Sequence, residues 1–198
     1  TGRAAERAMS IARRHRRPLP GFGISLGLGT AWLGVVVLLP LAALFALAAG
    51  ILSLIQVYRW WHKAVLKEPM LWILFAGYAF TGLGLMAVGV SYWKPSCLNL
   101  GVHLIGVGGI GVLTLGMMTR TALGHTGQSI YPPPKSVPIA FWLMIASTLV
   151  RIVATFVGGT AYTHSIRLSA VLFAASLLLY AWQYIPWLIR PRLDGKAG

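Results

Sequence analysis

Five long apolar stretches dominate this chain of 198 residues. A helix needs about 20 apolar residues to cross the hydrocarbon core of a bilayer, and every stretch is long enough to do so. They span residues 24–56, 70–93, 98–118, 137–157 and 166–188. Backbone polar groups in lipid must be satisfied within the protein, and little sequence lies between the stretches. The sequence therefore predicts an all-α, polytopic integral membrane protein with five to six transmembrane helices.

Basic residues greatly outnumber acidic residues in this chain, but charged residues are few altogether. Lys and Arg number 17 against 3 Asp and Glu, yet only 10% of the residues are charged and the mean hydropathy is +0.74. A soluble domain carries about 25% charged residues, so a basic surface for nucleic acid cannot be built here. The predicted partner is the lipid bilayer, not nucleic acid.

The first stretch is too long for one ordinary crossing. Its 33 residues would extend about 50 Å as a single helix, and Pro40 lies near its middle. Two structures are compatible with it, one long kinked helix or two short spans that meet in a turn at Pro40.

Basic residues near span ends favour the cytoplasmic side of a membrane. With six spans, 14 of the 17 Lys and Arg fall on one face; with five, the six arginines of the N-terminal arm oppose the other eight. The charges around the five C-terminal spans all agree with one orientation, and only the N-terminal arm and the long first stretch conflict with it. We expect a multi-pass protein of the bacterial inner membrane with a cytoplasmic C-terminus. Aromatic residues at span ends are predicted interfacial anchors: Tyr58, Trp60, Trp61, Tyr92, Trp93, Tyr184 and Trp187.

The third stretch concentrates the unusual residues. An imidazole inside a span suggests function by default, and His103 could bind haem iron or copper. It could equally make a helix–helix hydrogen bond to Thr81 or Thr148. Six glycines in the same stretch favour close helix packing, with a groove for a flat cofactor as the second interpretation. They are Gly101, Gly106, Gly108, Gly109, Gly111 and Gly116.

Two thioethers and a second histidine follow. Met117 and Met118 are candidate soft copper ligands, although filler is the commoner role of Met. A straight helix puts Met117 about 21 Å from His103 along the axis, which is too far to share a metal. His125 is predicted in a Gly-flanked loop at the other membrane face, as a ligand or an exposed polar residue.

Arg151 lies inside the fourth stretch, where a cation needs an acid, a carbonyl, a cofactor propionate or snorkelling. The three acidic residues, Glu6, Glu68 and Asp194, all lie outside the spans. No hydrolytic or nucleophilic apparatus is visible. Whether the chain is an enzyme stays open, and any activity would depend on haem or copper.

Residues 47–188 resemble the C-terminal part of the NnrS family. The resemblance rests on three motifs: His103-Leu-Ile-Gly-Val-Gly-Gly-Ile-Gly, Leu115-Gly-Met-Met-Thr-Arg120 and Leu123-Gly-His-Thr-Gly-Gln128. Gln128 departs from the Arg that is more frequent there. The resemblance implies a polytopic inner-membrane protein with haem and copper, implicated in the nitric-oxide stress response and denitrification. It makes His103 and His125 candidate ligands of metal or haem, Met117, Met118 and Arg120 weaker candidates, and Arg151 a partner for a propionate.

Residues 9–45 resemble the N-terminus of the sulfate/thiosulfate ABC-transporter permease T subunit, through Leu19-Pro-Gly-Phe-Gly-Ile-Ser-Leu-Gly and Leu38-Leu-Pro-Leu-Ala-Ala-Leu-Phe45. A junction is then expected near residues 41–50. The predicted organisation has four parts: a basic cytoplasmic arm (1–23), a permease-like span (24–46), an NnrS-like membrane domain (47–188) and a basic tail (189–198).

Two other functions compete with the haem and copper protein. One is a component of a transporter such as the sulfate permease, and the other is a structural fragment without cofactor. NnrS proteins have about twice as many spans, so we expect further N-terminal spans or a homo-oligomer to complete the assembly.

Overall fold

The structure, a computed structural model, describes residues 21–129 and 132–191. The basic arm predicted at 1–23 therefore lies almost wholly outside the described residues, as does most of the tail predicted at 189–198. Every regular element in the described ranges is helical, which confirms the all-α prediction. By contact the chain forms two compact units, residues 1–41 and 42–198.

Within the described residues, five helices are long and apolar enough to cross a membrane. Their bounds are Phe22–Trp60 (α2), Pro69–Val90 (α3), Cys97–Thr126 (α4, η2 and α5 together), Ser136–Ala154 (α6) and Gly159–Leu188 (α7). A short 3₁₀-helix, η1 at Lys63–Lys67, links α2 to α3.

Helix α2 is one helix of 39 residues with Pro40 inside it. The alternative of two short spans joined by a turn at Pro40 is therefore wrong, and residues 21–129 and 132–191 contain five candidate spans. Proline removes one backbone donor and disturbs the preceding turn without always ending a helix. Pro40 has apolar helix-forming residues on both sides, so the helix continues through it.

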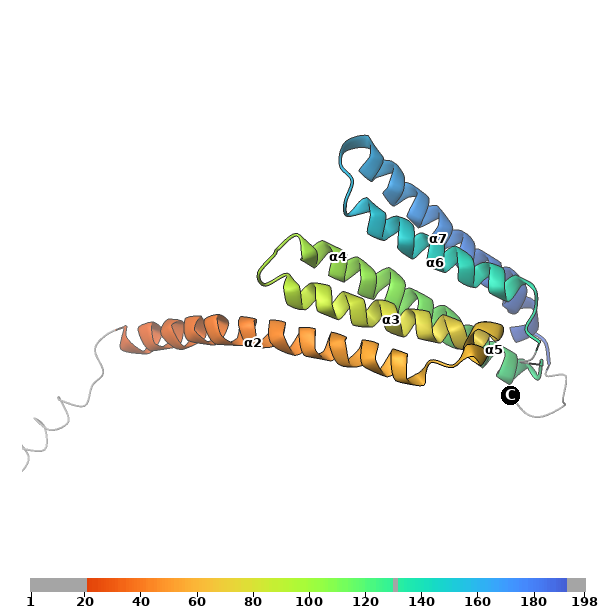
Figure 1. The fold of residues 1–198 in the computed structure, drawn as a ribbon, viewed down its shortest axis with the longest axis horizontal. Helices are drawn as coiled ribbons and strands as arrows, with labels where there is room; N and C mark the ends of the chain where they lie inside the picture. Colours follow the sequence, from red (N-terminus) through yellow and green to blue (C-terminus); the bar gives the residue numbers. More distant parts are fainter. Residues whose placement is uncertain (1–20, 130–131, 192–198) are drawn as a thin grey trace, which may run out of the picture. The chain divides into compact units, whose positions relative to one another are not determined.

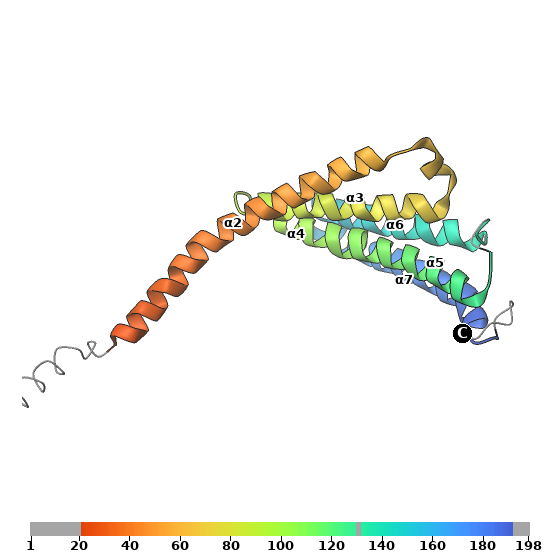
Figure 2. The ribbon, with the colours of Figure 1, turned by 90° about the horizontal axis from the view of Figure 1, so that it is seen from below.

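Within residues 42–198 the spans alternate in direction. Figure 1 shows α3 beside α4 and α5, and α6 beside α7; Figure 2 shows the same helices from below. At one end of this unit α2, α5 and α7 finish while α3 and α6 begin. We call it the basic end, because it carries most of the described cations: Arg59, Lys63, Lys67, Arg120, Lys135 and Arg190. The opposite end carries Lys94, Arg151 and Arg167.

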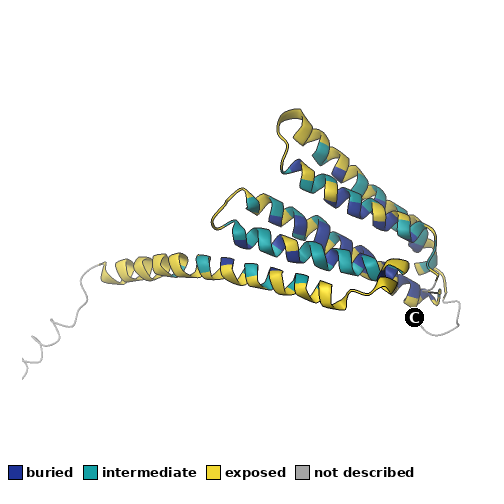
Figure 3. Ribbon diagram, in the orientation of Figure 1, coloured by how far each residue is buried: buried dark blue, intermediate teal, exposed yellow. Residues whose placement is uncertain are grey.

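The hydrophobic core is made by the inner faces of α3, α5, α6 and α7. Figure 3 shows buried residues concentrated on the facing sides of these helices. The largest fully buried side chains include Met70, Ile73, Leu123, Phe141 and Tyr184. Because these core residues occupy the half of the unit nearer the basic end, that half is the better-packed scaffold.

Paired hydroxyls join α6 to α7. The Ser147 hydroxyl donates to the carbonyl of Ser169 at 2.8 Å, and the Ser169 hydroxyl donates to the carbonyl of Ser147 at 2.9 Å. Ser176 donates to the carbonyl of Ala140 at 2.8 Å. Small hydroxyl residues let helices approach closely and bond across the contact in a membrane. This pair of helices is therefore held by polar as well as apolar contacts.

The glycines of the third span serve packing, as the first interpretation predicted. A Cβ at Gly101 would lie 2.9 Å from the carbonyl oxygen of Gly84 on α3, and one at Gly108 would lie 2.8 Å from Phe80. Gly109 abuts Thr81 in the same way. Only Gly106 of the six has nothing within 4 Å. The groove for a flat cofactor is therefore filled by α3 along most of this run.

Candidate functional site

A pocket of about 530 Å³ opens between α5 and α7 at the basic end. It contains three of the predicted ligands, Met117, Met118 and His125. The complete lining is Leu113, Thr114, Met117, Met118, Thr121, Ala122, His125, Tyr180 and Leu188. Apolar side chains with a few converging polar groups are typical of small-molecule and cofactor sites.

Helix α5 brings these ligands together because it is longer than predicted. It continues to Thr126, so His125 lies in its last turn and the predicted loop position is wrong. Gly127 ends the helix in the left-handed conformation, with φ of 70°, and its N–H bonds to the carbonyl of Leu123. Glycine is the usual residue at such a cap, whereas Gly124 is tolerated inside the helix.

The helical spacing then explains the shared lining. Met117, Thr121 and His125 follow one another at intervals of four residues, and residues four apart lie on one side of a helix. Met117 is 52% exposed and Met118 is 38% exposed, so both thioethers are accessible. Arg120 is exposed but does not line the pocket.

Helix α7 closes the pocket with Tyr180. The Tyr180 hydroxyl donates to the carbonyl of Met118 at 3.4 Å. Its ring stacks on Tyr184, with 4.7 Å between centroids, and Tyr184 contacts Trp187 edge to face at 5.5 Å. These three aromatic residues anchor α7 beside the methionine-bearing face of α5.

Tyr184 was expected to be an interfacial anchor and is instead a core residue. It is 2% exposed, and its hydroxyl has no hydrogen-bond partner among the described residues. The spacing of Tyr180, Tyr184 and Trp187 at i, i+4 and i+7 was the available signal, because it puts all three on one helical face. Tyr58, Trp60, Trp61, Tyr92 and Trp93 are exposed near span ends, as anchors should be.

The other intramembrane residues pair with each other. Arg151 Nε on α6 lies 3.5 Å from His103 Nδ1 at the end of α4, so the guanidinium donates to the imidazole. The partner of His103 is thus Arg151 and not Thr81 or Thr148, whose hydroxyls donate to carbonyls of their own helices, Gly77 and Met144. Both His103 and Arg151 are half-buried.

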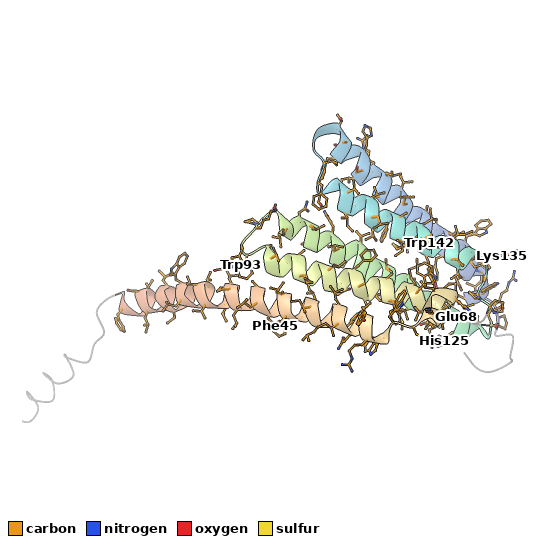
Figure 4. The ribbon with its side chains drawn as sticks, viewed as in Figure 1. Phe45, Glu68, Trp93, His125, Lys135 and Trp142 are labelled. Atoms are coloured by element: carbon orange, nitrogen blue, oxygen red, sulfur yellow. The ribbon has the colours of Figure 1, made fainter. Side chains whose placement is uncertain are left out.

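No acidic side chain approaches this pair in the described part of the chain. Glu68 is the one carboxylate there, and it precedes α3 at the basic end, whereas Arg151 lies one turn from the finish of α6 at the opposite end. Figure 4 shows Glu68, His125 and Lys135 together at the basic end and Trp93 at the other. The structure thus places His103 with Arg151, and His125 with Met117 and Met118, in two separate sites.

Neither site has the donor set of a hard or borderline metal. No group of three His, Cys, Asp or Glu residues comes together within residues 21–129 and 132–191. Zinc sites are usually built from three or four such ligands. A metal in the α5–α7 pocket would need thioether ligands, which select Cu(I).

A family model described as NnrS protein matches residues 2–192. The match runs through the junction expected near residues 41–50 and includes residues 9–45, whose likeness to the permease T subunit no comparison supports. No curated protein and no solved structure matches the chain. Because one model accounts for nearly its whole length, the chain belongs to the NnrS family.

Proposed function

We propose that this protein binds copper and haem in the bacterial inner membrane and acts in the response to nitric oxide, as the likeness to NnrS proteins implies. The observation that carries the proposal is the pocket between α5 and α7, where Met117, Met118 and His125 line one cavity. All three residues were singled out from sequence motifs, and Met117 and His125 lie eight residues apart on α5, about 12 Å along its axis.

Copper fits the donors of this pocket. The two thioethers are soft donors that suit Cu(I), and they lie among largely apolar side chains in a pocket that also contains the imidazole of His125. Bound copper would supply one-electron chemistry and a coordination position for nitric oxide. Met117 and Met118 would hold the metal, with His125 about 12 Å farther along the axis of α5, while Tyr180 fixes the backbone of Met118 through its hydrogen bond.

The second site, formed by His103 and Arg151, would have to change before it could hold haem. Arg151 offers a cation for a propionate, and no carboxylate of the described residues neutralises it. His103 accepts from Arg151 at Nδ1, so the proton of the neutral ring belongs on Nε2. Before Nε2 could bind iron, His103 would have to release Arg151 and shift that proton. In the arrangement observed, His103 serves to position Arg151.

The distribution of charge supports an orientation. Six described cations lie at the basic end against three at the opposite end. Cytoplasmic flanks of spans are enriched in Lys and Arg. We assign the basic end, and with it residue 190, to the cytoplasm.

Metal content and the optical spectrum of the purified protein test the proposal. We expect one copper per chain, and a Soret band if haem is held. Replacing Met117 and Met118 by Leu conserves volume and should lower the copper content at least tenfold, whereas His125→Ala should lower it less. The matched controls are Met86→Leu and His164→Ala, which lie outside the pocket and should keep the copper.

Two results would refute parts of this proposal. If the Met117→Leu, Met118→Leu double variant retains copper, the α5–α7 pocket is not the copper site. A protein with neither copper nor a Soret band, after expression in copper- and haem-supplied cells, would instead support a structural membrane component without cofactor.

A further inference from the structure

A second groove lies on another side of the basic end, between the last turn of α2, η1, α3 and α6. Its volume is about 290 Å³, and its lining is entirely apolar or aromatic. The residues are Val57, Trp61, Leu66, Trp72, Phe75, Ala76, Ala79 and Trp142. It shares no residue with the α5–α7 pocket, so it is a separate site.

Aromatic contacts hold the walls of this groove in place. Trp72 packs against Trp142 with 5.0 Å between ring centroids and meets Phe141 edge to face at 5.9 Å. Trp61 packs on Phe75 at 6.2 Å. Phe141 is fully buried, so it fixes Trp72 to the core. The groove is consequently formed before any ligand enters.

Cations border the groove at its membrane-surface end. Lys63 and Lys67 begin and end η1, which contributes Leu66, whereas Arg59 follows Val57 by two residues and therefore lies on the opposite side of α2. Buried Val65 anchors η1, and His62 caps it by accepting from the N–H of Ala64 at 3.3 Å. Arg59, Lys63 and Lys67 are all exposed.

The apolar lining of the groove and the cations beside it indicate what kind of ligand it binds. A hydrocarbon chain matches a wall without carboxylate, amide or hydroxyl side chains, whereas a quinone ring needs polar partners for its carbonyls. Clustered Lys and Arg at the membrane surface attract anionic headgroups. We propose that the groove binds an acyl chain of an anionic phospholipid, with its phosphate against Lys63 and Lys67.

Lipid titration of the purified full chain, followed by native mass spectrometry in non-ionic detergent, tests this assignment. Each cation near an anionic headgroup contributes about fivefold in affinity. Long-chain phosphatidylglycerol should therefore bind well over tenfold more tightly than phosphatidylcholine. The variant Lys63→Gln, Lys67→Gln should lose about 25-fold in phosphatidylglycerol affinity and change little with phosphatidylcholine.

Arg190→Gln is the matched control, because it removes an exposed cation from the same end but from α7, away from the groove. It should keep the wild-type affinity. Dihexanoyl phosphatidylglycerol tests the acyl chain separately and should bind at least about tenfold more weakly than the long-chain lipid, since its chains bury less apolar surface.

Several outcomes would overturn the assignment. They are equal affinity for the two headgroups, an equal loss in Arg190→Gln, equal affinity for short and long chains, or displacement of the lipid by a quinone at lower concentration. Copper content of the Gln variants should stay at the wild-type level, so this test and that of the proposed function fail independently.

Discussion

At the residue scale, the buried hydroxyl of Tyr184 is the clearest departure from ordinary packing. It lies in the core with no hydrogen-bond partner among the described residues. An unsatisfied buried donor costs about 1–3 kcal/mol. Tyr184→Phe should therefore raise the free energy of unfolding by about 1 kcal/mol, measured by denaturant titration in detergent micelles.

Tyr180→Phe is the natural control for that measurement. It removes a hydroxyl that does have a partner, the carbonyl of Met118 at a long 3.4 Å, and should change the free energy of unfolding by less than about 0.5 kcal/mol. If Tyr184→Phe lowers stability instead, the hydroxyl is satisfied in the membrane and the penalty does not exist.

His103 and Arg151 are each recognisable from sequence as a costly group inside a span. Their partnership is not, because it joins α4 to α6 over 48 positions of sequence. Period and spacing relate residues on one helix, whereas a contact between helices depends on how the helices pack.

At the element scale, the third span is three successive helices, α4, η2 and α5. The middle one, Leu104–Gly111, is a π-helix, which is wider than an α-helix. A uniform 100° per residue therefore does not describe how the residues after η2 are turned relative to His103. His103 in fact contacts Arg151, while Met117 lines the pocket beside α7.

The close contact of Gly101 with α3 predicts how a substitution there would affect stability. A Cβ at Gly101 would stand 2.9 Å from both the carbonyl oxygen of Gly84 and the backbone N of Val88. Neither backbone atom can move without shifting α3, so Gly101→Ala should lower the free energy of unfolding by about 1–3 kcal/mol.

Gly106→Ala, in the same span, is the matched comparison. No neighbour lies within 4 Å of its Cβ position, and alanine loses less backbone entropy in a helix than glycine does. This variant should be unchanged or more stable by about 0.5 kcal/mol. Equal effects of the two substitutions, followed by thermal unfolding in detergent, would show that α3 and α4 do not pack closely.

At the scale of the whole molecule, the alternating spans of residues 42–198 make topology testable. A reporter fused after Arg190 should give a cytoplasmic signal, and one inserted in the turn at residues 93–96 should give a periplasmic signal. The reason is that six described cations lie at the basic end against three at the other. Exchanged signals would contradict the orientation.

Membrane placement, the five apolar stretches and the identity of the unusual residues followed from the sequence alone. The length of an apolar stretch is a local property of the sequence, and it determines whether a helix can cross the bilayer. Motif spacing likewise indicated the NnrS family. The sequence could not decide whether the first stretch turns at Pro40, because proline kinks some helices and ends others.

Tertiary structure decided which residues meet. It extended α5 through His125, because Gly127 rather than Gly124 ends the helix, and so joined His125 to Met117 and Met118 in one pocket. It also buried Tyr184, paired His103 with Arg151 and formed the groove beside η1. These are relations between helices distant in sequence, set by side-chain packing and close glycine contacts, which one-dimensional patterns do not contain.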